Sequence, residues 1–368
     1  SNLHSENGRV MIEGRGGNNA ESSMDGIQLL GDVSLSAASD VSLHGKAGHS
    51  RSPDEGAGIY IKGEKDGASI DADRVEMVGI GAKRDLESAW PKIENESVTY
   101  TIGVHAENLD LHATGDVNIK GKGGYGNQDL DGVALTNVTI QSEGRVDLKG
   151  FSGYSDTMDQ STGVYLDRFN LTANTAGIYG RHSSKKDAPS GKKLDGIYIR
   201  NSTIDVQDHF EAFGLPSKGG KVKNNAGIFA IDSNVIADSM VVYGLAPEFI
   251  DYIDGNLKYE SITNLLDESN SVTGKNIGLW FKDSKFLTRN GQLKVGGVGG
   301  FGKKKGHGVW FDKSTNLTAK NGNLVVIGLA GVGASEMYGV FAEQSQWSTD
   351  MDIKIRAESA ESVTGKNN

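Results

Sequence analysis

The chain has 368 residues, of which 51 are Gly and none is Cys, and its formal net charge at pH 7 is −10. The lack of Cys excludes disulfides, thiolate metal sites and thiol catalysis, and the negative balance argues against nucleic acid as a partner of the whole chain. With no run of 18 apolar residues and no basic leader with an apolar core, the sequence predicts neither a membrane span nor an export signal.

A Gly followed by Val, Ile or Leu recurs along the chain at a nearly constant spacing. The ten copies are Gly26, Gly58, Gly103, Gly132, Gly163, Gly196, Gly227, Gly278, Gly308 and Gly339. Seven of the nine spacings lie between 29 and 33 residues, and the other two are 45 and 51. A fixed period with occasional insertions is typical of a solenoid, in which each repeat buries its apolar face against the next.

Within each repeat the apolar period is two. In the repeat that begins at Gly308, Val309 and Phe311 alternate with Trp310, and the triplets 317–319 and 324–326 follow after turn-prone residues. Three short strands per repeat predict an all-β fold, a parallel β-helix of about ten coils, and right-handed crossovers are the expected sense. The many Gly residues suit corners that need positive φ or close backbone approach.

The predicted organisation is one continuous β-helical segment over residues 1–368, with loop insertions at 81–101 and 244–277. The longer insertion is apolar enough to hold a short helix near 257–266. Both ends join the repeat in the middle of a coil, and neither resembles a capping repeat. We therefore expect a segment excised from a much longer fibre.

The middle residue of each first strand is expected to point outward, because its two neighbours point into the core. These outer residues are Gln28, Tyr60, His105, Ala134, Tyr165, Tyr198, Phe229, Trp280, Trp310 and Phe341. Seven of the ten are aromatic. The rings either stack on one another and stiffen the sheet, covered by the insertions, or form an exposed platform on which sugar rings lie.

Basic residues gather in the loops that precede several first strands. The candidates for contact with an anionic ligand are Arg181, Lys185, Lys192, Lys193, Lys218, Lys221, Lys303, Lys304 and His307. In an acidic chain, basic loops beside aromatic positions suit a carboxylate or sulfate ligand. The alternative is that these lysines are only solvated.

Catalytic and metal sites are not predicted. Asp71 and Asp73 form the only close carboxylate pair on a strand pattern, with no second cluster in register, and the eight His residues lack ligand spacing. Asp25, Asp131 and Asp195 each precede a repeat Gly, which is common turn chemistry. We expect no enzyme activity, no cofactor and no metal.

Residues 31–37 leading into 40–45, and 317–319 leading into 321–324, resemble the filamentous-haemagglutinin-type repeats of two-partner-secretion exoproteins. Among these the chain looks most like the binding segment of the high-molecular-weight non-pilus adhesins. The resemblance implies a secreted or surface-bound bacterial protein, exported through an outer-membrane pore, that binds host-cell glycans and sialylated ones in particular. A chain without Cys is compatible with such export.

The expected function is therefore adhesion of a bacterial surface protein, monomeric and not membrane-spanning, to acidic host glycans. The ligand residues would be the six last outer rings, Tyr165, Tyr198, Phe229, Trp280, Trp310 and Phe341, together with the basic loops. The alternative is a structural spacer or receptor-binding stick of a contact-dependent toxin-delivery or haem-acquisition exoprotein, which shares the same coils. A polysaccharide lyase or hydrolase is the weaker third reading.

Overall fold

A computed structural model confirms an all-β solenoid of stacked parallel strands. It describes residues 1–20, 24–50, 56–64, 67–82, 101–125, 129–153, 160–182, 193–216, 224–245, 274–300, 304–331 and 335–358. Every regular element in these residues is a strand. The predicted helix near 257–266 and nearly all of the insertions at 81–101 and 244–277 lie outside the described residues.

The chain forms two compact units, an N-terminal unit of residues 1–183 and 202–207 and a C-terminal unit of residues 184–201 and 208–368. Each unit contains the three predicted stacks, called here first, second and third strands after their order in a coil. That the chain is a single continuous segment stays a prediction.

In the N-terminal unit the first strands are β4 (Ile27–Leu30), β8 (Ile59–Lys62), β11 (Val104–Ala113), β13 (Val133–Ser142) and β15 (Gln160–Asp167). The second strands are β1 (Asn2–Ser5), β5 (Ser34–Ala37), β9 (Ala68–Ala72), the later parts of β11 and β13, β16 (Asn170–Ala173) and β19 (Thr203–Val206). The third strands are β2 (Val10–Arg15), β6 (Asp40–Lys46), β10 (Arg74–Ile80), β12 (Val117–Lys122), β14 (Arg145–Phe151) and β17 (Thr175–Arg181). A short extra pair joins β3 (Asn18–Ala20) to β7 (His49–Ser50).

In the C-terminal unit the first strands are β18 (Lys193–Arg200), β21 (Asn224–Ile231), β24 (Lys275–Lys282), β27 (Val309–Asp312) and β30 (Val340–Ala342). The second strands are β22 (Asn234–Ala237), β25 (Lys285–Thr288), β28 (Asn316–Ala319) and β31 (Gln346–Thr349). The third strands are β20 (His209–Leu215), β23 (Ser239–Gly244), β26 (Leu293–Val298), β29 (Leu324–Leu329) and β32 (Ile353–Glu358).

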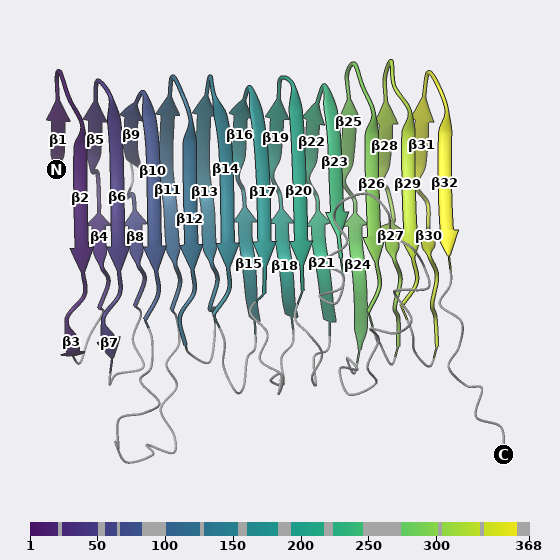
Figure 1. Cartoon of the computed structure of the whole chain (residues 1–368), viewed down its shortest axis with the longest axis horizontal. Coiled ribbons are helices and arrows are strands. Elements are labelled where there is room, and N and C mark those ends of the chain that lie inside the picture. The colour runs from purple at the N-terminus through teal and green to yellow at the C-terminus, as the bar shows by residue number, and fades with distance from the viewer. Residues whose placement is uncertain are drawn as a thin grey trace, which may run out of the picture. The chain divides into compact units, whose positions relative to one another are not determined.

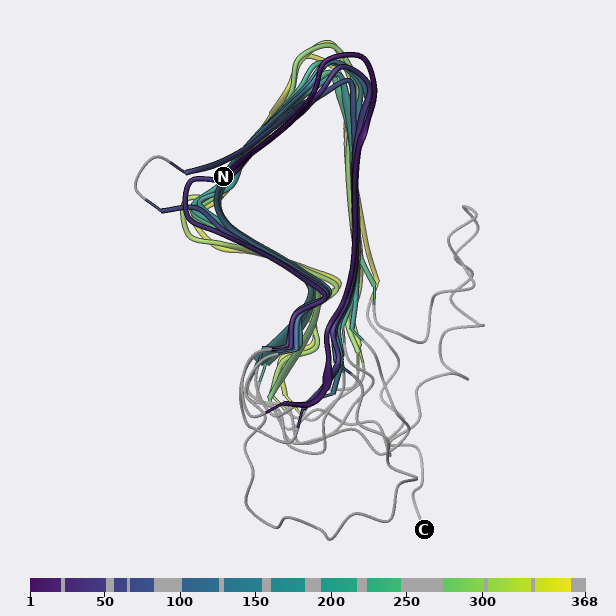
Figure 2. The ribbon, with the colours of Figure 1, turned by 90° about the vertical axis from the view of Figure 1, so that its left-hand side faces the viewer.

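Figure 1 shows the third strands running opposite to the first and second strands of the same coil. With β1 nearest the viewer, the N-terminal unit rises through first and second strands, turns over and descends through third strands, clockwise as it recedes (Figure 2). That is the right-handed sense expected for parallel crossovers. Among the described residues the third strands number six in the N-terminal unit and five in the C-terminal unit, so the number of coils differs slightly from the predicted ten.

The predicted inward face is confirmed. Val309, Phe311, Leu317 and Val326 are fully buried. In the N-terminal unit Ile119, on β12, lies opposite Leu148, on β14, in the parallel register and both are buried. Like residues stacked in this way build one row of the core, which is how a solenoid buries apolar surface that no single coil could bury.

The repeat Gly is needed for close backbone approach more than for positive φ. A Cβ atom on Gly121, near the end of β12, would lie 1.8 Å from the carbonyl oxygen of Gly132, which begins the next first strand. No side chain fits at that distance, so the third strand and the following first strand come together through glycines.

Positive φ falls instead on a corner residue five positions after the repeat Gly. Asn108, Asn137 and Asn201 have φ values of 53°, 52° and 49° there, and among the described residues Gly31 and Gly67 are the glycines with positive φ. Asn tolerates this left-handed conformation. At one corner Asn137 Nδ2 donates to Asn108 Oδ1 at 2.7 Å, so neighbouring corners also bond to each other.

Candidate functional site

The outer residues of the first strands in the C-terminal unit form a continuous column of rings. Phe229 stacks on Trp280 with ring centroids 4.4 Å apart, and Trp280 stacks on Trp310 at 4.6 Å with an interplanar angle of 1°. Tyr198 meets Phe229 edge-on at 5.3 Å, and Phe341 meets Trp310 edge-on at 6.0 Å. The spacing follows from strand separation, because parallel register sets like residues about 4.8 Å apart.

This stacking limits what the rings can present to a ligand. Trp280 has a ring on each side, Phe229 in the preceding coil and Trp310 in the next, so both of its faces are in contact with protein. Tyr198 and Trp310 are buried, at 7% and 6% exposure. The column therefore lacks the open flat platform that one sequence interpretation required, and the stacking interpretation describes Trp280 and Trp310 better.

Two lysines cover the ring column from the position three residues before the repeat Gly. Lys275 Nζ lies 4.5 Å from the Trp280 ring centroid and 4.7 Å from that of Trp310. Lys305 Nζ lies 4.6 Å from the Trp310 centroid and pairs with Glu336 at 2.7 Å. Backbone bridges join Lys275 to Lys305 and Lys305 to Glu336, so the three form a second column beside the rings.

Lys275 differs from Lys305 in its partners. No carboxylate of the described residues lies within ion-pair distance of its ammonium group. Burial lowers the pKa of Lys275, and the charge of Lys305 lowers it further. The indole nitrogens of Trp280 and Trp310 are buried and, within the described part of the chain, have no hydrogen-bond acceptor. The Lys275 ammonium group and the two indole N–H groups therefore lie close together with few hydrogen-bond acceptors among the described residues.

The sequence analysis missed Lys275 as a site residue. The signal was present, because Lys275 and Lys305 both stand three residues before a repeat Gly and five before a Trp. Those positions precede the alternating strand pattern, so the period of two assigns them no place beside the rings.

His307 precedes the repeat Gly308 and is fully buried. Its Nδ1 accepts a hydrogen bond from the Tyr338 backbone N–H at 3.3 Å, and its ring stacks on Tyr338 and Phe341 at 5.3 Å. Burial lowers the pKa of His307 to about 4, and the charge of Lys305 acts in the same direction. His307 is therefore a neutral, structural acceptor between coils and not a cationic ligand residue.

In other coils an Asp stands at the position of His307, directly before the repeat Gly, and its side chain accepts the equivalent hydrogen bond from the next coil. Asp25 Oδ1 accepts from Ala57 N at 2.7 Å, Asp131 Oδ1 from Thr162 N at 2.6 Å, and Asp195 Oδ1 from Ala226 N at 2.8 Å. Each donor is the equivalent residue of the next coil. The Asp-Gly pairs are thus inter-coil caps, a role more specific than the turn chemistry that the sequence suggested.

The remaining predicted basic residues are not brought together by the described residues. Lys304 is exposed in the C-terminal unit, and Arg181 is exposed at the end of β17 in the N-terminal unit. Lys193 begins β18, where only its backbone is described, and Lys185, Lys192, Lys218, Lys221 and Lys303 lie outside the described residues. Tyr165 belongs to the N-terminal unit, whereas the other five predicted ring residues belong to the C-terminal unit.

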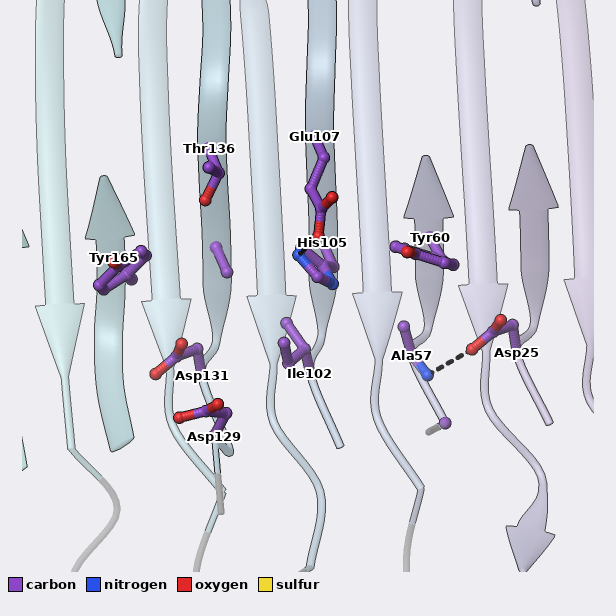
Figure 3. Close-up of a pocket in the computed structure, with 12 residues that line it drawn as sticks. Asp25, Ala57, Tyr60, Ile102, His105, Glu107, Asp129, Asp131, Thr136 and Tyr165 are labelled. Carbon is purple, nitrogen blue, oxygen red and sulfur yellow. Dashed lines mark hydrogen bonds and ion pairs between the residues drawn. The ribbon is translucent and has the colours of Figure 1, made fainter. Parts of the chain in front are cut away.

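The N-terminal unit has a cavity of about 330 Å³ over its own outer column (Figure 3). Its lining includes Tyr60, His105, Ala134 and Tyr165, the outer residues of four successive first strands. Carboxylates surround these positions, namely Asp25, Glu107, Asp129 and Asp131. Its charge is therefore opposite to that of the Lys275 and Lys305 column.

Glu107 is held by two neighbouring side chains. His105 Nε2 lies 3.0 Å from Glu107 Oε1, and Lys62 Nζ lies 3.5 Å from Oε2. The hydrogen bond from His105 lowers the pKa of Glu107 to about 2, against the opposing effect of burial. Tyr60 contacts the other side of the His105 ring at a centroid distance of 5.0 Å.

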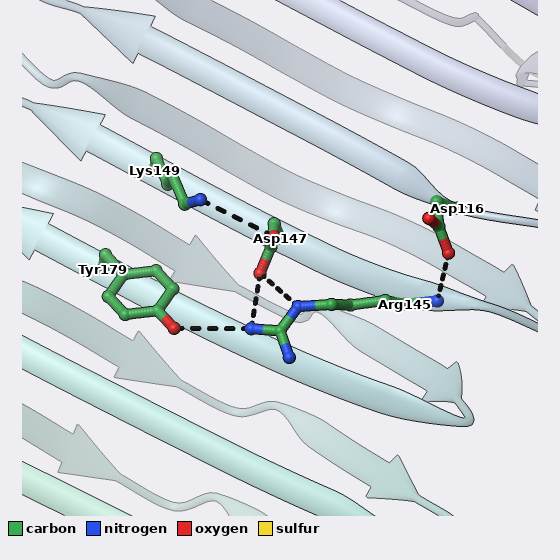
Figure 4. Close-up of polar contacts among 5 residues, drawn as sticks. All are labelled: Asp116, Arg145, Asp147, Lys149 and Tyr179. Carbon is green, nitrogen blue, oxygen red and sulfur yellow. Dashed lines mark hydrogen bonds and ion pairs between the residues drawn. The ribbon is translucent and has the colours of Figure 1, made fainter.

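On the outer face of the third strands in the N-terminal unit, Arg145 and Lys149 share one carboxylate, that of Asp147 (Figure 4). Arg145 Nε and a terminal guanidinium nitrogen both lie 3.0 Å from Asp147 Oδ1, and Lys149 Nζ lies 3.6 Å from Asp147 Oδ2. Arg145 also donates to Tyr179 Oη at 3.4 Å. The charges of Arg145 and Lys149 are therefore both engaged by Asp147.

Comparison with protein-family models, with characterised proteins and with solved structures gave no match to this chain. The described part of the chain contains no helix suited to crossing a bilayer. It also contains no group of three or more Asp, Glu, His or Cys side chains positioned to share a metal ion.

Proposed function

We propose that this chain is a segment of a bacterial surface adhesin that binds an acidic glycan along the lysine and tryptophan column of its C-terminal unit. The proposal includes the location and the route that the repeat resemblance implies, namely secretion through an outer-membrane two-partner pore and display at the cell surface. The carboxylate or sulfate of the glycan would lie at Lys275.

One observation carries the proposal. The Lys275 ammonium group lies within 4.7 Å of two Trp ring centroids, next to a second lysine, and has no carboxylate partner among the described residues. Partial burial of Lys275 beside the like charge of Lys305 costs free energy, which an anionic ligand would recover.

The ring column takes a different role from the one expected from sequence. Because Phe229 and Trp310 cover both faces of Trp280, a sugar ring would contact ring edges and lysine stems, and the acidic group would supply most of the affinity. Binding is then expected to depend on charge and to weaken with salt.

The test begins with a glycan array on the intact chain, followed by titration of sialyllactose, sulfated lactose and neutral lactose. Lys275→Gln should weaken the acidic ligands about tenfold, the loss expected for one charge-assisted contact. Lys285→Gln, at an exposed position of β25 away from the rings, is the matched control and should bind like the parent.

A purely structural spacer is the second candidate, favoured by the mutual stacking of the rings and by the Lys305–Glu336 ion pair. A spacer should bind no glycan above background on the array. Acidic glycan binding that survives Lys275→Gln would instead place the ligand elsewhere, with the basic loops as the next region to test.

A further inference from the structure

The outer face of the third strands in the C-terminal unit also carries aromatic residues in register. Phe213 on β20 lies opposite Tyr243 on β23, and Tyr243 lies opposite Gly296 on β26. The rings of Phe213 and Tyr243 stack with centroids 5.8 Å apart and an interplanar angle of 25°. This column of rings ends at Tyr243, because the next coil has a glycine at the outer position.

Gly296 lets the Tyr243 ring lean across the neighbouring strand. A Cβ atom on Gly296 would lie 2.2 Å from Tyr243 Cε1 and 2.4 Å from Cδ1, so the ring occupies the space that a side chain would take. Glycine inside a strand weakens it and often marks a place where another group approaches closely. Gly296 is buried, whereas the Tyr243 side chain above it is partly exposed.

Tyr243 therefore differs from Trp280, whose two faces are both covered by rings. Among the residues that the structure describes, Phe213 is the one ring in contact with Tyr243. The outer residues Val241 and Ile327, on β23 and β29, are also partly exposed and add apolar surface to the same face. The face of an aromatic ring is electron-rich, so it attracts the polarised C–H bonds of a sugar ring.

A cation stands beside this aromatic surface. Lys294 Nζ lies 5.5 Å from the Tyr243 centroid, near the roughly 6 Å limit of a cation–π contact, so that contact is weak. Lys354, two coils further along the same row, pairs with Asp352 at 3.7 Å, whereas no carboxylate of the described residues lies within ion-pair distance of Lys294. A ligand carboxylate would give Lys294 a charge-assisted hydrogen bond, which is stronger than the ring contact it would replace.

We propose that Tyr243 and Lys294 bind a hexuronate residue of an acidic polysaccharide, with the sugar ring stacked on Tyr243 and its carboxylate at Lys294. A β-linked glucuronate suits both contacts, because all its ring substituents are equatorial and each face of the ring presents only axial C–H bonds. Its carboxylate is attached to the same ring, so one sugar residue reaches the aromatic surface and the ammonium group together. The site lies on the third strands, apart from Lys275 on the first strands, and it does not rest on the proposed function.

The experiment is a saturation-transfer NMR titration of the intact chain with methyl β-D-glucuronide and methyl β-D-glucoside. These sugars differ only in a carboxylate against a hydroxymethyl group. Both should receive saturation at their ring C–H protons, and the glucuronide should bind roughly fivefold more tightly at low salt. Absence of binding would overturn the proposal, and equal affinity for the two sugars would overturn the assignment to an acidic sugar.

Variants separate the two contacts. Tyr243→Ala should abolish binding of both sugars, and Tyr243→Phe, which keeps the ring, should bind both like the parent. Lys294→Gln should leave the glucoside unchanged and reduce the affinity of the glucuronide to the same level. Lys285→Gln, at an exposed position of β25, is the matched control. Binding of either sugar that survives Tyr243→Ala would contradict the location.

Gly296→Ala tests the geometry without removing either contact residue. The new methyl group would displace the Tyr243 ring from the strand and should weaken binding of both sugars, so unchanged affinities would overturn the role of the leaning ring. Circular dichroism and the melting temperature verify that each variant folds. If this face instead joins two copies of the chain, sedimentation would show a dimer that Tyr243→Ala abolishes, and the proposal would be wrong.

Discussion

The two units use one scaffold and differ in the outer column of their first strands. Both have the same buried rows and the same glycine contacts between third and first strands. In the C-terminal unit the outer column is unbroken and flanked by Lys275 and Lys305, whereas in the N-terminal unit Ala134 interrupts it among carboxylates. At a coil spacing of about 4.8 Å, aromatic residues in register contact each other by default, so an open ring surface requires a gap.

The largest expected effect tests what the two units share. Val326 is fully buried on β29 and Val325, its neighbour, points to the outer face. Val326→Asp would leave an unpaired charge in the core and should cost several kcal/mol of unfolding free energy. Val325→Asp should change it by about 0.5 kcal/mol or less. Chemical denaturation measures both.

The pair of valines is its own control, because the residues are adjacent and the substitution is the same. Similar losses in the two variants would mean that the period of two does not divide the strand into buried and outer faces. The residues compared between the two units could then not be assigned to an outer column.

The next expected effect is a loss of stability at low pH, and it is specific to His307 of the C-terminal unit. The pKa of His307 is about 4 in the folded protein and about 6.5 when exposed, so the unfolded state binds more protons between these values. The stability that neutral His307 contributes is complete above about pH 6.5 and falls as the pH drops toward 4. The loss amounts to roughly 3 kcal/mol.

His307→Asn isolates this contribution, since Asn can still accept the Tyr338 N–H bond but does not titrate. The measurement is the melting temperature of both proteins from pH 7 to pH 4. The parent should lose more stability than the variant over this range, whereas carboxylates shared by both cancel in the difference. Parallel curves would contradict the depressed pKa.

The third effect concerns the ring column itself. Trp280→Ala removes stacking on both Phe229 and Trp310 and should cost about 2 kcal/mol, less than a fully buried Trp because the side chain is partly exposed. Lys285→Ala, on an exposed part of β25, serves as the control. An unchanged melting temperature for Trp280→Ala would favour rings held open for a ligand.

The fold and its core could be predicted because they depend on periodicity. Alternation placed Val309, Phe311, Leu317 and Val326 inside, and the recurring Gly located the first strands. Ring contacts at neighbouring coils also follow from register alone. These features need no knowledge of side-chain direction beyond the period of two.

The sites could not be predicted because they depend on residues just before the strand pattern. Lys275 and Lys305 extend back over the rings from a segment without alternation, and His307 replaces the Asp cap of other coils. The sequence showed that Ala134 is a small residue at a position where most repeats have an aromatic one. The pattern of residues could not predict that Asp129 and Asp131 line a cavity next to Ala134.

The smallest effect separates the units by the direction of its response to pH. Burial raises the pKa of Asp131 well above that of an exposed Asp, so the folded state binds its proton more readily than the unfolded state. The stability contributed by Asp131 is therefore complete at acid pH and is lost as the pH rises through the raised pKa, opposite to that of His307. Asp131→Asn keeps an acceptor for the Thr162 N–H and removes the charge.

The variant should melt higher than the parent at pH 7, and the difference should shrink as the pH falls, which a series of melting curves measures. Asp129→Asn is the companion variant, since removing the like charge should also lower the pKa of Asp131 toward its ordinary value. A parent that is more stable than Asp131→Asn at every pH would mean that interactions of the charged carboxylate already offset the cost of burying it.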